Sequence, residues 1–295
     1  MQDFAGRVAV ITGGGGGFGR EFARLAARFG MKLALADIER EALDEIVGEL
    51  RGEGTSVFGE VVDVARADDV ARLAERTYAE FGAVHLLFNN AGVGCGGLLW
   101  ENSEADWQWV LGVNLMGVVH GVRHFVPRML AAEAQGVPGH VINTASIAGW
   151  VTPPLMGVYN VSKHAVVALS ETLHHDLRLA GSRIGVSCLC PAFVPTGIAH
   201  SQRNRPQEMT NQQPPTASMR LAQASLDKAV SSGRLTAAQV AQQTFEAIRA
   251  DRFHVFTHPR ILPAVEARLR AALDGAPPAD PLAARATVRP PNPRA

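Results

Sequence analysis

A glycine-rich turn between an apolar segment and an amphipathic one constrains this 295-residue chain more than any other feature. The turn spans residues 12–19, after the apolar run 7–11 and before a helical pattern at 18–29. In such a turn, backbone N–H groups at the start of a helix can approach a pyrophosphate, whose negative charge the helix dipole favours. The alternative is a flexible linker, but linkers are not flanked by a buried strand and an apolar-periodic helix. The turn therefore predicts a dinucleotide site.

An acidic residue follows the second predicted strand and indicates which dinucleotide is bound. Asp37 lies about 20 residues after the turn, the offset at which a carboxylate accepts hydrogen bonds from an adenosine ribose. It would repel a 2′-phosphate, and residues 13–19 contain no Arg or Lys to compensate. We therefore expect NAD(H) rather than NADP(H), with Arg40 as a signal in the other direction. Asp37 can also cap the helix that follows, and the two roles are compatible.

Strand-like and helix-like segments alternate along most of the chain. The predicted strands are 7–12, 31–36, 56–62, 84–89, 139–145, 183–190 and 253–257. The predicted helices are 18–29, 39–51, 66–81, 104–132, 158–180, 236–251 and 261–273. This alternation predicts an α/β fold with a doubly wound parallel sheet, Rossmann-like, in three αβα layers. Since nothing before about residue 255 resembles a linker, we expect a single domain over 1–275.

Two segments do not follow this alternation of strands and helices. Residues 195–232 are polar and contain four prolines, which predicts an irregular lid over the site, with disorder as the alternative. Its expected inward contacts are Met209, Met219, Leu221 and Leu226. Residues 276–295 are rich in Pro, Ala and Arg, so we expect an extended or disordered tail.

Charge and hydropathy exclude several function classes. Lys and Arg balance Asp and Glu, so no net field attracts nucleic acid or an anionic membrane. No apolar run reaches the ~18 residues that a transmembrane helix needs. The acid at Asp3 and the strand that follows leave no room for a signal peptide, so we expect a cytoplasmic protein.

Cysteine and histidine positions do not predict a metal site. The three cysteines lack metal-ligand spacing, and Cys188 and Cys190 share one strand face, a poor disulfide geometry, so we expect them reduced. His120 and His124 are four residues apart on a helix but lack an evident third ligand.

Three residues carry side chains that could perform chemistry. Tyr159 and Lys163 lie one turn apart on one helix face, where an ammonium can favour the phenolate of its neighbour. An exposed Tyr–Lys helix pair is the alternative. Ser146 ends a predicted strand at the carboxyl edge of the sheet, where open α/β sheets bind ligands, although it could simply cap a turn.

Together these motifs resemble the short-chain dehydrogenase/reductase superfamily, in its compact single-domain branch, from about Asp3 to Pro259. The resemblance implies a cofactor site made of Gly13, Gly17, Phe18, Gly19, Asp37, Asp63, Val64, Asn90, Ala91, Gly92, Tyr159, Lys163, Pro191, Val194 and Thr196. It departs from the family pattern at Ala192, where glycine is usual.

The resemblance also implies a catalytic tetrad of Asn114, Ser146, Tyr159 and Lys163. Tyr159 would exchange a proton with the substrate oxygen while hydride moves to or from the nicotinamide. Lys163 would lower the Tyr159 pKa and hold the nicotinamide ribose. Ser146 would hydrogen-bond the substrate oxygen, and Asn114 would hold a water that links Lys163 to solvent.

The segments that would border the substrate are apolar. They predict a bulky secondary alcohol or ketone, held by Ser146, Trp150, Leu155, Met156 and Tyr159. Trp150 could instead pack the sheet edge. The alternatives are an NADP(H)-dependent reductase of a 3-oxoacyl or similar carbonyl and, from another class, a non-catalytic dinucleotide-binding regulator. Relatives pair through the helix at 158–180, which is apolar on more than one face here, so we expect a homodimer or homotetramer.

Overall fold

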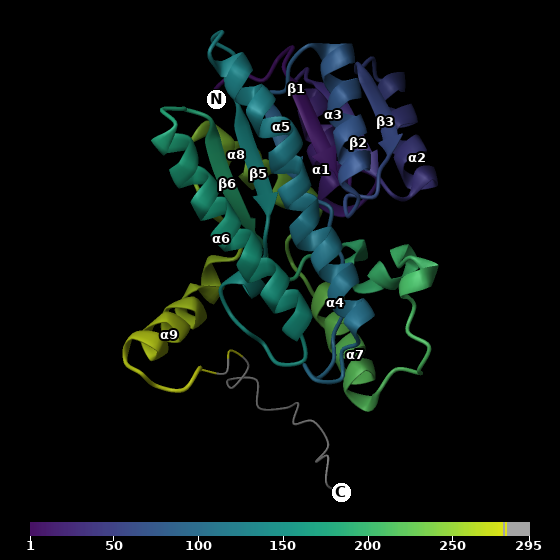
Figure 1. The fold of residues 1–295 in the computed structure, drawn as a ribbon, viewed down its shortest axis with the longest axis vertical. Coiled ribbons are helices and arrows are strands. Elements are labelled where there is room, and N and C mark those ends of the chain that lie inside the picture. The colour runs from purple at the N-terminus through teal and green to yellow at the C-terminus, as the bar shows by residue number, and fades with distance from the viewer. Residues whose placement is uncertain (280, 282–295) are drawn as a thin grey trace, which may run out of the picture.

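A parallel sheet forms the centre of the molecule, in a computed structural model that describes residues 1–279 and 281 (Figure 1). Its strand order is β3-β2-β1-β4-β5-β6-β7. The strands are β1 (Val8–Thr12), β2 (Lys32–Asp37), β3 (Val57–Val61), β4 (Leu86–Asn89), β5 (His140–Thr144), β6 (Gly185–Cys190) and β7 (His254–Phe256). Every neighbouring pair is parallel, and Val10 of β1 pairs with both Ala34 of β2 and Leu87 of β4. The strand order reverses between β1 and β4, so a crevice opens at their carboxyl ends.

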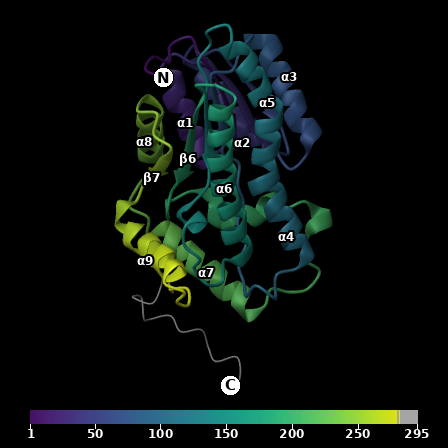
Figure 2. The ribbon, with the colours of Figure 1, turned by 60° about the vertical axis from the view of Figure 1, so that its left-hand side comes forward.

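Helices cover both faces of this sheet (Figure 2). The helices of the described residues are α1 (Gly17–Arg28), α2 (Arg40–Gly52), α3 (Ala67–Phe81), α4 (Glu104–Leu111), α5 (Gly117–Glu133), α6 (Gly157–Leu179), α7 (Ala217–Ser231), α8 (Ala237–Arg249) and α9 (Leu262–Leu273). Of these, α4, α7 and α9 lie beyond the carboxyl ends of the strands rather than on a sheet face. The fold class predicted from the alternation of segments is therefore confirmed.

Two apolar layers enclose the sheet because successive strand residues point to opposite faces. Ile11 of β1 packs into one layer with Phe22 of α1 and Phe245 of α8. Its neighbour Val10 packs into the other layer with Phe125 of α5. Burial on both faces explains why the strands read as continuous apolar runs rather than alternating ones.

The single helix predicted at 104–132 is divided. A π-helical turn, Gly112–Met116, separates α4 from α5. Such wide turns frequently occur at functional sites, and apolar periodicity does not reveal them.

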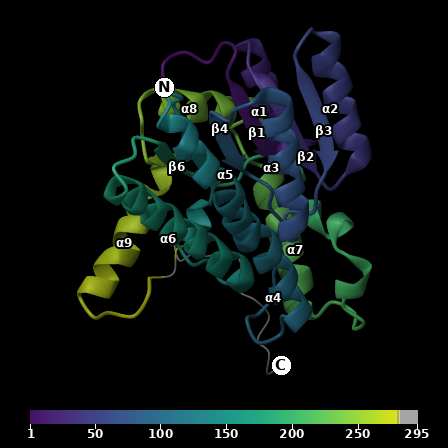
Figure 3. The same ribbon diagram turned by 45° about the horizontal axis from the view of Figure 1, so that its top comes forward.

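The lid segment 195–232 is not irregular throughout, so that part of the prediction was wrong. It contains 3₁₀ turns at Gly197–Asn204 and Gln207–Met209, followed by α7. Figure 3 shows α7, like α4, beyond the carboxyl ends of the strands. The side chain of Thr216 accepts a hydrogen bond from the Met219 N–H, a helix-starting cap hidden in a polar stretch. The predicted tail, 276–295, lies mostly outside the described residues.

Candidate active site

A cavity of about 450 Å³ lies at the carboxyl edge of the sheet. It is lined by residues that follow six of the strands, with α6 and the lid segment on its other walls. The predicted site residues that line it are Gly13, Gly17, Phe18, Asp37, Asp63, Val64, Asn90, Ala91, Gly92, Ser146, Leu155, Met156, Tyr159, Lys163, Pro191, Val194 and Thr196. Residues far apart in the sequence are thus brought to one site.

Two glycines of the turn are required for different reasons. Gly13 has a φ of +65°, and a Cβ added there would lie 2.9 Å from the Ala91 Cα. A Cβ on Gly19 would lie 1.9 Å from the Gly13 carbonyl oxygen. Gly19 itself does not line the cavity but has this packing role, and its cofactor contact stays a prediction. It lets α1 begin directly against the turn.

Asp37 lines the cavity with its carboxylate held by backbone donors. Its Oδ2 accepts from the Gly15 N–H at 2.8 Å, and its Oδ1 accepts from the Glu39 N–H at 3.0 Å. Burial raises the pKa of Asp37, and these hydrogen bonds oppose the rise. The residue before α2 is Glu39, so Asp37 forms an Asx turn rather than the helix cap considered above.

Side chains at the ends of β1, β4 and β5 hold these strands in register. The Asn90 amide donates to the Thr12 carbonyl at 2.9 Å, and Thr12 Oγ1 accepts from the Asn90 N–H at the same distance. Thr144 Oγ1 donates to Asn90 Oδ1 at 3.3 Å. Side-chain hydrogen bonds therefore link the carboxyl ends of β1, β4 and β5 where they border the cavity.

Ser146, Tyr159 and Lys163 converge on the cavity from β5 and α6. Lys163 Nζ donates to the Thr144 carbonyl at 2.8 Å and lies 5.6 Å from the centroid of the Tyr159 ring. Ser146 Oγ accepts from the Ala148 N–H at 3.1 Å and donates to the Pro191 carbonyl at 3.3 Å. The arrangement places a hydroxyl, a phenol and an amine at one wall.

Burial shifts the pKa values of both Tyr159 and Lys163. It raises the pKa of Tyr159, against a hydrogen bond with Ser146 that lowers it. It also lowers the pKa of Lys163 to about 8. The predicted lowering of the Tyr159 pKa by Lys163 is not what the structure shows, because desolvation dominates and the amine is held by a carbonyl.

Asn114 lies in the π-helical turn with its amide fully engaged. Its Oδ1 accepts from the Val93 N–H at 2.8 Å, while Nδ2 donates to the Val93 carbonyl at 2.9 Å and to Ser162 Oγ at 3.0 Å. It does not line the cavity, but a Cβ on Gly92 would contact both Asn114 Oδ1 and Lys163 Nζ, within 3.6 Å. Asn114 thus joins the segment after β4 to the helix of Lys163, and its water-holding role stays a prediction.

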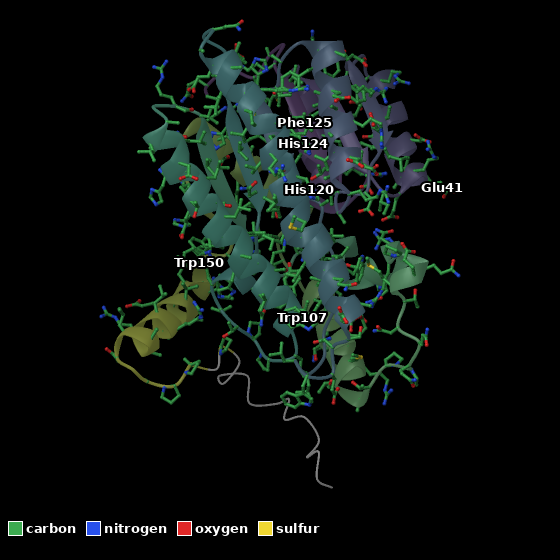
Figure 4. The ribbon with its side chains drawn as sticks, in the orientation of Figure 1. Glu41, Trp107, His120, His124, Phe125 and Trp150 are labelled. Atoms are coloured by element: carbon green, nitrogen blue, oxygen red, sulfur yellow. The ribbon has the colours of Figure 1, made fainter. Side chains whose placement is uncertain are left out.

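Trp150 points away from the cavity, which corrects its predicted substrate contact. It lies near the junction of α6 and α9 in Figure 4 and is not among the lining residues. Its ring packs edge-on against His254, 5.2 Å between centroids, and against Phe256 at 5.8 Å. The alternative interpretation, packing at the sheet edge, is the one that the structure supports.

Several residues that line the cavity could not be predicted from the sequence. Glu39 lies with Arg203 and Asn204 at the Asp37 end, and Ile261 and Ala264 close the opposite wall from the chain's C-terminal part. No motif marks them, since only the fold brings them to the cavity. Of the predicted lid contacts, Met209 and Leu226 line the cavity, whereas Met219 and Leu221 do not.

The remaining predicted residues have structural partners. His120 is buried, with Nδ1 2.9 Å from the Val64 carbonyl oxygen. Cys188 and Cys190 are free thiols with Sγ atoms 3.8 Å apart. Within the described part of the chain, no cluster of three or more His, Cys, Asp or Glu side chains could hold a metal ion. No helix among residues 1–279 is long and apolar enough to cross a membrane.

Fold and site together define a Rossmann-like α/β protein whose cavity lies at the carboxyl edge of the sheet, where such folds bind dinucleotides. Residues 7–207 match the short chain dehydrogenase family, and the chain belongs to that family. The resemblance drawn from the motifs is confirmed.

Three similar proteins illustrate the relationship. A short chain dehydrogenase/reductase from Burkholderia phymatum, solved in complex with NAD, is 54% identical with a TM-score of 0.93, covering 96% of this chain and all of that one. A CLA biosynthesis dehydrogenase/reductase from Lactiplantibacillus plantarum is 34% identical over 94% of this chain and 97% of its own length. A C alpha-dehydrogenase from a Sphingobium strain is 39% identical over 70% of this chain and 66% of its own.

Proposed function

We propose that this protein is an NAD(H)-dependent dehydrogenase or ketone reductase that acts on a bulky, largely apolar secondary alcohol or its ketone. The observation that carries the proposal is the convergence of Ser146, Tyr159 and Lys163 on an apolar part of the cavity. The nicotinamide cofactor, when bound, supplies or accepts the hydride. The protein contributes orientation, proton transfer and a fixed electrostatic environment.

Each member of the tetrad has a distinct role in the proposal. The Tyr159 hydroxyl gives a proton to the substrate oxygen in reduction and takes it back in oxidation. Ser146 donates a hydrogen bond to that oxygen as charge develops on it. Lys163 holds the nicotinamide ribose through its amine, and Asn114 holds the segment after β4 against α6, which keeps Lys163 in position.

The preference for NAD(H) rests on Asp37. Its carboxylate lines the cavity at the end of β2, where it can accept hydrogen bonds from ribose hydroxyls and would repel a 2′-phosphate. The glycine turn holds no cation to offset this repulsion. The Burkholderia relative was solved with NAD, which agrees with this preference.

The substrate walls support an apolar substrate. The cavity lining includes aliphatic and thioether side chains from the segment after β5, from the lid and from the C-terminal part of the chain: Ile147, Val151, Leu155, Met156, Met209, Leu226, Ile261 and Ala264. A carboxylate or phosphate placed among these groups would lose its hydration without gaining a cation. A substrate with an aryl or alicyclic group would bury apolar surface there instead.

We also propose a homodimer or homotetramer. Most apolar residues of α6 that suggested it, such as Val158, Val166 and Leu177, belong to the monomer's own core. Val161 of this helix is 47% exposed, so fewer apolar side chains of α6 are available for subunit contacts than the sequence pattern indicated.

The test is a panel of secondary alcohols and ketones followed by NADH absorbance in both directions. We expect an aromatic ketone to show a kcat/KM above that of a short oxo acid, and NADH to be used in preference to NADPH. A higher value for the oxo acid would overturn the substrate proposal, and a preference for NADPH would refute the argument from Asp37. Sedimentation of the same preparation at micromolar concentration should give a dimer or tetramer, and a monomer would refute the assembly.

A further inference from the structure

Two residues that line the cavity near Asp37 form an ion pair. Arg203 Nη2 donates to Glu39 Oε1 at 2.7 Å, and Asn204 Nδ2 donates to the same oxygen at 2.7 Å. Glu39 immediately precedes α2, whereas Arg203 and Asn204 belong to the lid segment. All three residues line the cavity. The lid and the end of β2 are therefore joined by one carboxylate.

Arg203 is the cation that could otherwise meet a phosphate at this end. Among the described residues, the Lys and Arg side chains that line the cavity are Lys163 and Arg203. Lys163 is bound to the Thr144 carbonyl and lies beside Tyr159. Arg203 Nη1 donates to the carbonyls of Gly197 and His200, at 3.0 and 2.9 Å, so its guanidinium is fixed on the lid.

The pair is next to the carboxylate that faces the ribose in the proposed function. The backbone N–H of Glu39 donates to Asp37 Oδ1, while its side chain holds Arg203. The hydrogen bond from Arg203 is the largest cause of a pKa of Glu39 below its ordinary value, so the carboxylate is charged at neutral pH. Two negative groups thus occupy this end, and the nearby guanidinium is already engaged.

We propose that Glu39 is a specificity-determining residue that disfavours NADP(H) by keeping Arg203 paired and away from a 2′-phosphate. The inference rests on the proposed function for the position of the adenosine ribose. A guanidinium binds phosphate through paired charge-assisted hydrogen bonds, and a carboxylate competes for the same donors. Removal of the Glu39 carboxylate leaves Arg203 Nη2 free to meet a phosphate, while Nη1 stays bound to the Gly197 and His200 carbonyls.

The experiment compares two glutamates at the start of α2. Glu39→Ala removes the partner of Arg203, and Glu41→Ala is the control, since Glu41 is exposed at the outer side of α2 in Figure 4 and does not line the cavity. Both variants lose one negative charge near the same helix end. Binding of NADPH and NADH to each purified variant is measured by calorimetry at one fixed salt concentration.

We expect Glu39→Ala to bind NADPH roughly three- to fivefold more tightly than wild type does, because loss of a half-exposed ion pair frees one guanidinium–phosphate contact, with NADH affinity nearly unchanged. Glu41→Ala should bind both as wild type does. In the double variant Glu39→Ala/Arg203→Met, the gain for NADPH should disappear.

Two results would overturn the inference: equal NADPH affinity in the Glu39 and Glu41 variants, or a gain that survives the loss of Arg203. Wild-type binding alone tests the preference assigned to Asp37. The inference is decided by the differences between variants, so the two can fail separately.

Discussion

At the scale of single residues, the site combines a buried amine with a half-buried phenol. Lys163 is 3% exposed, and its Nζ has the Thr144 carbonyl as its hydrogen-bond partner. Desolvation lowers the pKa of Lys163 from 10.5 in the unfolded chain to about 8. Burial of this amine therefore lowers the stability of the fold, at a position where the proposed function has Lys163 bind the nicotinamide ribose.

This cost has a pH dependence with a definite sign. Between pH 8 and 10.5 the unfolded chain binds more protons at Lys163 than the folded chain does, so stability rises with pH in this window and the full cost is present below it. Relative to Lys163→Met, wild type without cofactor should gain about 1 kcal/mol of unfolding free energy between pH 7 and pH 9. Urea denaturation of both proteins at the two pH values measures this. A difference that stays constant or shrinks would contradict the assigned pKa.

Single residues also show where sequence reasoning reached its limit. The glycine turn, Asp37 and Ser146 could be predicted to share a site, because strand ends in a parallel sheet meet at one edge. Tyr159 and Lys163 are assigned to that site by the family resemblance, since they lie on a helix. The direction of the Trp150 ring could not be predicted, because an apolar loop residue can face either the cavity or β7.

At the scale of elements, the lid is anchored by a buried ion pair. Arg205 Nη1 donates to Asp106 Oδ1 at 2.6 Å, with side chains only 5% and 3% exposed. The Arg205 guanidinium also lies over the Trp109 ring at 5.2 Å, and its Nε donates to the Met209 carbonyl. The polar composition of the segment predicted a lid but gave no sign of this link to α4, whose partners are 99 residues apart.

Removal of this anchor should loosen the first half of the lid. Loss of one partner of a buried ion pair costs about 3–5 kcal/mol, because the other charge is left without compensation. In Arg205→Met, amide hydrogen exchange over 197–211 should accelerate by roughly tenfold or more. The control is Arg203→Met, whose half-exposed pair is worth less than about 1 kcal/mol and should change exchange little. Equal exchange in the two variants would show that Arg205 does not hold the lid.

At the scale of the whole molecule, the sheet order determines which residues can form a site. The order reverses between β1 and β4, and the cavity lies at the carboxyl ends of these strands and their neighbours. Alternating segments predicted this architecture because parallel connections are right-handed and need a helix between strands. The C-terminal wall from Ile261 and Ala264 could not be predicted, because a surface-like helical pattern does not show where the helix packs.

The central claim is that this cavity is the active site of a dehydrogenase in which Tyr159 transfers the proton. The most direct measurement is Tyr159→Phe, which removes the phenol oxygen and keeps the ring, so NADH should still bind. Turnover of the best ketone should fall by roughly a hundredfold or more, the usual contribution of a positioned acid–base group, while calorimetry gives an NADH affinity near that of wild type. A variant that keeps near-normal turnover would contradict the account.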